Sequence, residues 1–111
     1  MMPRGPLQLL QGSLDLLVLG ALASGSAHGY GVATHVKERS DGTLVIEDAA
    51  LYQALHRLER KGLVSAEWGL SDNNRRARYY ALTGEGRKRL REEAANWRRY
   101  ARAVSAVLEG T

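Results

Sequence analysis

The chain has 111 residues, which is enough for one small domain with a real core, and its 44% apolar content excludes a disordered protein. It contains no cysteine, which excludes a thiol nucleophile, a disulfide framework and a cysteine-based zinc site. The net charge is +4, but residues 56–91 hold ten basic and four acidic residues, whereas residues 1–55 hold three basic and five acidic ones. A basic block of this kind predicts a polyanionic partner, most simply a nucleic acid.

The N-terminal region lacks the features of a secretory signal and of a membrane span. Residues 1–10 form a proline-containing arm, and the apolar run over residues 7–10 is short and interrupted by glutamine. The longest apolar segment, residues 14–23, is interrupted by Asp15 and Gly20 and is too short to cross a bilayer. We therefore expect a cytoplasmic protein that makes no membrane contact and whose arm docks on an apolar surface through its leucines.

Two helices are predicted in the first third of the chain. Ser13 is a suitable N-cap for a helix over residues 14–23, which is apolar around nearly its whole circumference. A helix of this kind is usually covered on both sides, so we expect part of its cover to come from a second subunit. A second helix is predicted over residues 28–39, with Tyr30 in the core, and a brief β-branched strand over residues 43–46 follows.

The most informative stretch is a helix predicted from Glu47 to about residue 61. Glu47 or Asp48 can cap its start, and Gly62 can end it in a left-handed conformation. Its leucines recur at i, i+4 and i+7 and share an inner face: Leu51, Leu55 and Leu58. The outer face has no acidic residue and carries Ala49, Tyr52, Gln53, His56, Arg57 and Arg60. Such a helix suits a DNA major groove, although an ordinary solvated face is the alternative.

Two strands joined by a basic loop follow this helix. Residues 64–68 and 77–82 are predicted as strands, and the loop between them, residues 69–76, is rich in turn-forming residues. The tip of this hairpin carries Asn73, Asn74, Arg75 and Arg76. A helix pair followed by a hairpin is the winged helix-turn-helix arrangement, in which the hairpin tip can reach phosphates or the minor groove.

The last predicted element is a long helix that Thr83 caps and that reaches about Leu108. Its apolar residues form an unbroken heptad seam: Leu90, Ala94, Trp97, Ala101, Val104 and Leu108. The helix extends beyond so small a domain, so we expect a second copy of the chain to cover the seam. An intramolecular helix that covers the first helix is the alternative.

Taken together, these segments resemble the PadR family of bacterial transcriptional regulators, in its short subgroup with one C-terminal helix. The segments that carry the resemblance are residues 28–30 (HGY), 51–59 (LYQALHRLE), 61–64 (KGLV), 78–80 (RYY), 82–83 (LT) and 86–87 (GR). The resemblance implies a homodimeric winged helix protein that binds a pseudo-palindromic operator, usually as a repressor. Ala49 and Ala50 stand where the family more often has glycine or a small hydroxyl residue, which removes possible hydroxyl contacts to phosphates.

Within this frame we expect Gln53 and Arg57 to read base edges, because glutamine can pair with adenine and arginine with guanine. Tyr52 and His56 are expected to touch phosphates or sugars, while the wing and Lys61 supply sequence-independent affinity. The candidate DNA-binding residues are Ala49, Ala50, Tyr52, Gln53, His56, Arg57, Lys61, Asn74, Arg75, Arg76 and Arg78. For each single arginine, a solvated surface charge is the alternative.

Trp97 lies in the middle of the heptad seam, so two copies can approach each other in a symmetric dimer. The resemblance to the short subgroup implies that such a pair can sandwich a flat aromatic effector, with Leu14 and Leu17 nearby. Plain packing of the dimer is the alternative. The identity of an effector does not follow from the sequence.

No set of histidine and carboxylate residues has metal-ligand spacing, and no glycine-rich loop follows a strand as a phosphate cradle would. We therefore expect neither an enzyme nor a cofactor. The expected fold is mainly α with a small β-hairpin (α+β), with a winged helix domain and its arm over residues 1–82 and a dimerisation helix over residues 83–111. The alternative function is a winged helix module that binds another protein without reading DNA.

Overall fold

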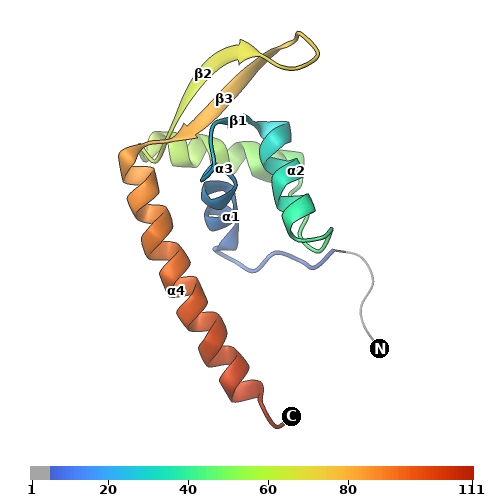
Figure 1. The fold of residues 1–111 in the computed structure, drawn as a ribbon, viewed down its shortest axis with the longest axis vertical. Helices are drawn as coiled ribbons and strands as arrows, with labels where there is room; N and C mark the ends of the chain where they lie inside the picture. The colour runs from blue at the N-terminus through green and yellow to red at the C-terminus, as the bar shows by residue number, and fades with distance from the viewer. Residues whose placement is uncertain (1–5) are drawn as a thin grey trace.

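Four helices and a three-stranded antiparallel sheet make up the part of the chain that the computed structural model describes, residues 6–111 (Figure 1). The elements in chain order are α1 (Ser13–Ala21), β1 (Ala27–His28), α2 (Gly29–Arg39), α3 (Asp48–Arg60), β2 (Val64–Leu70), β3 (Arg76–Leu82) and α4 (Gly84–Leu108). The expected α+β winged helix arrangement is confirmed. The first half of the predicted arm, residues 1–5, lies outside the described residues.

The start of α1 differs from the prediction. Ser13 is already the first helical residue, and its hydroxyl donates to the Leu10 carbonyl at 2.7 Å instead of capping the helix. Gly12 holds the N-cap position with a φ of 85°, a left-handed conformation that glycine adopts without a Cβ clash. The arm therefore turns into the helix at this glycine.

The core lies where the helices meet the base of the sheet. The inner leucines of α3 are at most 1% exposed, as their spacing predicts, and Tyr80 of β3 is buried among them. The largest side chains that are fully buried are those of Leu19, Leu22, Leu51, Leu55, Leu58, Val18 and Val32. The prediction that Tyr30 is a core residue is wrong, because it is 75% exposed while its neighbour Val32 takes the inward place on α2.

The observed strands differ from the predicted ones at two places. Strand β1 was not predicted, and the strand predicted over residues 43–46 does not form. β1 is two residues long and pairs with Tyr79 and Tyr80 of β3, so its existence depends on a partner far along the chain. The strand predicted over residues 43–46 is wrong, because only a single parallel bridge forms there, between Leu44 and Leu7 of the arm. The arm docks as expected: the Leu7 amide donates to the Thr43 carbonyl at 2.8 Å, and Leu9 packs on the core.

The wing, strands β2 and β3 with their loop, extends from the rest of the domain (Figure 1). Its strands are longer than predicted, and their pairing continues to Leu70 opposite Arg76. The loop is correspondingly short and is closed by the Ser71 amide, which donates to the Arg75 carbonyl at 2.8 Å. Asn74 adopts a φ of 63° there, a conformation that asparagine tolerates better than most residues.

Local capping chemistry behaves mostly as predicted. Gly62 ends α3 with a φ of 74°, and Thr83 caps α4 by accepting from the Gly86 amide at 3.0 Å. The expected side-chain cap of α3 is not observed: Glu47 occupies the N-cap position, but its carboxylate makes no capping hydrogen bond. Asp48 still lies in the first turn, where a negative charge favours the helix dipole.

α4 is 25 residues long and runs away from the domain (Figure 1). Its early seam residues Leu90 and Ala94 are half-buried, and α4 contacts α1. Beyond them most of its side chains are exposed. Among residues 6–111, no helix combines the length and the apolar character that crossing a membrane requires.

Replacing Tyr80 with phenylalanine is expected to change how stability depends on alkaline pH. Burial raises the pKa of Tyr80 above its ordinary value of 10.0, and the nearby positive charge of Arg78 opposes this shift. The Tyr80 hydroxyl loses its proton at a lower pH in the unfolded chain than in the folded one. The contribution to the free energy of unfolding is therefore fully present below the pKa of Tyr80 in the unfolded chain, and it is lost as the pH rises through the pKa in the folded protein. Urea unfolding across this range should show a steeper loss for the wild type than for Tyr80→Phe. Parallel curves for the two proteins above pH ~10 would contradict this assignment.

Candidate nucleic-acid interface

The outer face of α3 is open to solvent along its length. Gln53, His56 and Arg60 follow one another at i, i+3 and i+7, so they form one exposed stripe opposite the inner leucines. Ala49 and Tyr52 are also exposed, while Ala50 is half-buried. The stripe offers an amide, an imidazole and a guanidinium, the kinds of groups that bind base edges and phosphates.

Tyr52 is held against the start of α2. A Cβ added at Gly29 would lie 2.6 Å from the Tyr52 hydroxyl, so a larger residue there would require the Tyr52 ring to shift. The contact joins the first turn of α2 to the outer face of α3. The helix-turn-helix pair is therefore positioned by packing as well as by the connecting loop.

Arg57 is placed differently from the rest of the predicted site. Its guanidinium donates to both carboxylate oxygens of Asp15 on α1, with the Nε contact at 3.4 Å. This hydrogen bonding raises the pKa of Arg57, and partial burial of the guanidinium, which lowers the pKa, offsets only part of the rise. The pair directs Arg57 toward α1 and ties the two helices together.

A double-mutant cycle on Asp15→Ala and Arg57→Ala is expected to show coupling of about 0.5–1 kcal/mol in the free energy of unfolding. The value is modest because both side chains remain about a third exposed. Urea unfolding of the four proteins gives the coupling. The matched control is Asp15→Ala with Arg60→Ala, which should be additive. Additivity in the Arg57 cycle as well would mean that the pair does not form in solution.

The wing carries the remaining cations. Arg78 of β3 donates to the Glu59 carboxylate of α3 at 2.9 Å, which ties the wing to the last turn of that helix. The guanidinium of Arg76 lies 4.6 Å from the centre of the Trp68 ring. Within residues 6–111, ion pairs engage only Arg57 and Arg78, so the other candidate cations are available for a ligand: Arg60, Lys61, Arg75 and Arg76. We call these four cations together with Gln53 and His56 the α3–wing surface.

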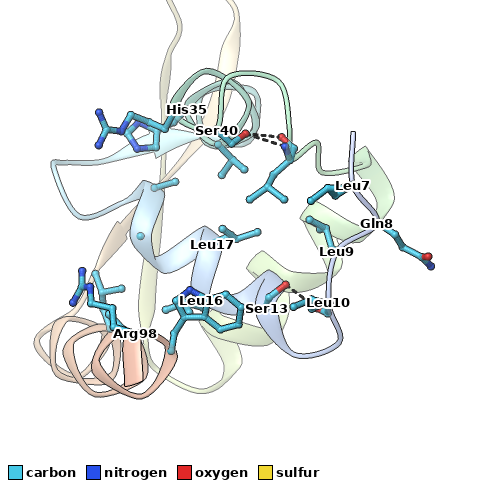
Figure 2. Close-up of a pocket in the computed structure, with 18 residues that line it drawn as sticks. Leu7, Gln8, Leu9, Leu10, Ser13, Leu16, Leu17, His35, Ser40 and Arg98 are labelled. Atoms are coloured by element: carbon cyan, nitrogen blue, oxygen red, sulfur yellow. Dashed lines mark hydrogen bonds between the residues drawn. The ribbon is translucent and has the colours of Figure 1, made fainter. Parts of the chain in front are cut away.

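A second candidate site is an apolar groove of about 770 Å³ between the arm, α1, α2 and α4 (Figure 2). It brings together Leu17 and Trp97, as predicted for an effector site, but Leu14 does not line it. In Figure 2 the arm leucines Leu7 and Leu9 lie along one side of the groove, across from Arg98 of α4. The groove opens beside the seam of α4, where Trp97 is 41% exposed.

The seam itself has little cover from its own chain. Leu90, Ala94 and Ala101 are half-buried, whereas Trp97, Val104 and Leu108 are exposed. Tyr100 and Val107 widen the exposed apolar surface of α4. The second half of this helix therefore presents an apolar face that its own domain leaves open.

The sequence model of the transcriptional regulator PadR-like family matches residues 18–92, from the buried half of α1 to the early turns of α4. The chain belongs to the PadR-like family. It is therefore a transcriptional regulator and not an enzyme. In the part of the chain that the structure describes, no three histidine, aspartate or glutamate side chains are placed to hold a metal ion.

Solved structures of other regulators share this PadR fold. A PadR family regulator from Eggerthella lenta is 33% identical and superimposes with a TM-score of 0.74, over 91% of this chain and 86% of that chain. A transcriptional regulator from Clostridium thermocellum reaches a TM-score of 0.79 at 26% identity, over 89% of this chain and 93% of that chain. PadR from Bacillus subtilis, solved in complex with operator DNA, is similar in fold, with a TM-score of 0.65 at 22% identity, over 73% of this chain and 46% of that chain.

Several residues of this PadR-like chain that shape the two sites were missed by sequence reasoning. Neither Asp15 nor Glu59 was predicted to pair with an arginine, because their partners lie 42 and 19 residues away. Leu16 and Val36 line the groove without having been singled out. The apolar arm was the one local signal for the groove, since its leucines need a surface to cover.

Proposed function

We propose that this chain is a homodimeric repressor that binds a pseudo-palindromic operator through the α3–wing surface. The observation that carries the proposal is the exposed stripe of Gln53, His56 and Arg60, which contains no acidic residue and continues into the cations of the wing. In a two-fold dimer, two such helices would enter successive major grooves about one helical turn apart. The winged helix domain with its arm would then comprise residues 1–82, and the dimerisation helix residues 83–111.

The residues of this surface, and their neighbours on α3 and the wing, have proposed roles. Gln53 reads a base edge, most simply adenine, and Arg60 takes the guanine-reading role expected of Arg57, because Arg57 is engaged by Asp15. Tyr52 and His56 contact phosphates or sugars, with Ala49 and Ala50 allowing close approach at the leading end of α3. Phosphate contacts that are independent of sequence come from Lys61, Asn74, Arg75 and Arg76, whereas Arg78 holds the wing to α3 through Glu59.

Dimerisation is supported by the open seam of α4. Trp97, Val104 and Leu108 lie in one heptad line and remain exposed on a helix that leaves the domain. A second α4 would cover them, and the half-buried side of α1 could contribute to the same interface. The operator complex of the Bacillus subtilis PadR protein gives a precedent for DNA binding by this fold.

A small flat aromatic molecule is the proposed effector, bound in the apolar groove beside Trp97. The lining is mainly apolar, with leucines, alanines and one indole beside a few polar side chains, and it suits a largely apolar ligand. The groove is bounded by α1 and α4 at the proposed dimer interface. Binding there would relieve repression by changing how the two protomers are spaced. Titration of a panel of planar aromatic compounds, followed by Trp97 emission and release of operator DNA, tests this role.

The function is tested by titrating the protein into labelled duplex DNA from upstream of its own gene, against a scrambled duplex, at two salt concentrations. Selective binding that weakens steeply with salt is expected. Gln53→Ala should reduce the selectivity by about 10- to 100-fold, because one base-edge contact is lost. Lys61→Ala is the matched control and should weaken binding to both duplexes equally. Equal, weak binding to every sequence, including those in a genome-wide selection, would contradict the proposal.

One observation favours a second function, a module that binds another protein. Trp68 and Leu70 of β2 are 62% and 64% exposed, and exposed apolar side chains often mark a protein interface. Under this reading the α3–wing surface would show no preference among DNA sequences. The DNA titration therefore separates the two functions.

A further inference from the structure

Trp68 and Leu70 occupy one side of the distal wing. They are two residues apart on β2 and therefore point to the same face of the hairpin. The register places Trp68 opposite Arg78 and Leu70 opposite Arg76, so each apolar side chain has an arginine beside it on the neighbouring strand. Because Arg78 of this face reaches Glu59, we call it the α3-facing side of the wing.

The two faces of the wing differ sharply in charge. On the α3-facing side the charged strand residues are Arg76 and Arg78, and neither strand places an acid there. On the opposite face the strands carry Glu67 and no cation. Exposed apolar surface and positive charge thus coincide on the side of the hairpin that continues toward the last turn of α3.

This combination fits DNA better than a protein. Protein interfaces are depleted of charge at their centres, whereas here every exposed apolar residue alternates with a guanidinium. A DNA groove offers both matching surfaces: phosphates for the arginines, and the apolar faces of sugars for an indole or a leucine. The stacking of Arg76 on Trp68 also holds the indole in place before any ligand arrives.

We propose that Trp68 and Leu70 pack into the minor groove that flanks each operator half-site, an inference that rests on the proposed function. Arg76, carried on the Trp68 ring, enters the same groove with them. A narrow minor groove concentrates negative potential, and A·T-rich steps provide that shape. The wing would therefore select A·T-rich flanks that α3 does not touch, through the shape of the DNA and not through base-edge hydrogen bonds.

The chain contains two tryptophans, so Trp97→Phe leaves Trp68 as the sole indole. Operator binding is followed by anisotropy of labelled DNA, and Trp68 by its emission and by acrylamide quenching. We expect the emission to change and acrylamide access to fall severalfold as operator binds. Selective binding with unchanged Trp68 emission and quenching would overturn this inference alone. Absence of selective binding in the wild type would overturn the proposed function and the inference together.

Flank preference is tested in the wild-type background, so that it does not depend on the Trp97 variant. Trp68→Ala should lower affinity about tenfold for an operator with A·T-rich flanks, and much less for one with G·C-rich flanks. Trp68→Phe should restore most of the loss, and Ser65→Ala, on the other face of β2, should cause none. An equal loss of affinity for both operators would overturn the inference that the wing recognises the shape of the flanking DNA. If acrylamide access to Trp68 were already low without DNA, and fell further as the protein concentration rose, the inference would be overturned. Trp68 and Leu70 would then belong to a contact between copies of the chain.

Discussion

Replacing Gly86 with alanine is expected to destabilise the fold by about 3 kcal/mol or more. A Cβ at this position would lie 1.9 Å from the carbonyl oxygen of Leu63, which is backbone and not a flexible side chain. That oxygen also accepts the Thr83 amide at 3.1 Å, so it cannot move aside without breaking a bond that joins the wing to α4. Thermal unfolding should show a melting temperature lower by roughly 10 °C or more.

Gly84→Ala is the matched control for this variant. Gly84 lies in the same first turn of α4, and a Cβ added there meets no atom within 4 Å. Alanine at that position should leave stability unchanged or raise it by up to about 1 kcal/mol, since alanine favours helix and restricts the unfolded chain. Similar small effects for the two variants would mean that the start of α4 is not locked against Leu63.

The close contact at Gly86 has a consequence for function. Thr83 donates its hydroxyl proton to the Gly62 carbonyl at 2.7 Å, so the end of α3, the base of the wing and the start of α4 meet at one point. This junction sets the direction in which α4 leaves the winged helix domain. In a dimer built on α4, that direction would determine the distance between the two recognition helices and hence the spacing of half-sites.

The parts of the fold that the sequence predicted correctly depend on local chemistry. The period of the leucines in α3 identifies its buried face, and Gly62 and Thr83 mark helix ends because capping uses neighbouring backbone groups. The wing is recognisable because two strands flank a loop of turn formers. None of these features requires knowledge of a distant partner.

The parts that could not be predicted depend on partners far apart in sequence. β1 forms because β3 lies beside it, and Leu44 makes a bridge only because the arm crosses next to it. The composition of the outer face of α3 followed from helical periodicity, but the ion pair between Arg57 and Asp15 did not. Which arginine is available for a ligand depends on Asp15, and that contact exists only after α1 and α3 have packed.

The variant Val104→Glu is expected to abolish dimerisation and to lower operator affinity by at least ~100-fold. Val104 lies on the exposed part of the seam, so in a two-fold dimer the substitution places two carboxylates in an apolar interface. Affinity falls because a monomer engages one half-site, and the gain from binding the second half-site on the same DNA is lost. Sedimentation and anisotropy of labelled operator measure the two effects.

Ala106→Glu is the control that gives this result its meaning. It adds the same charge two residues away, at an exposed position on the opposite side of α4 from the seam, and should remain a dimer with nearly unchanged affinity. Neither substitution touches the core, so the two proteins should unfold within about 0.5 kcal/mol of the wild type per protomer once dissociation is accounted for. If Val104→Glu remained dimeric with full operator affinity, the α4 seam would not be the interface. Another surface, such as the half-buried side of α1, would then have to bring the two recognition helices together.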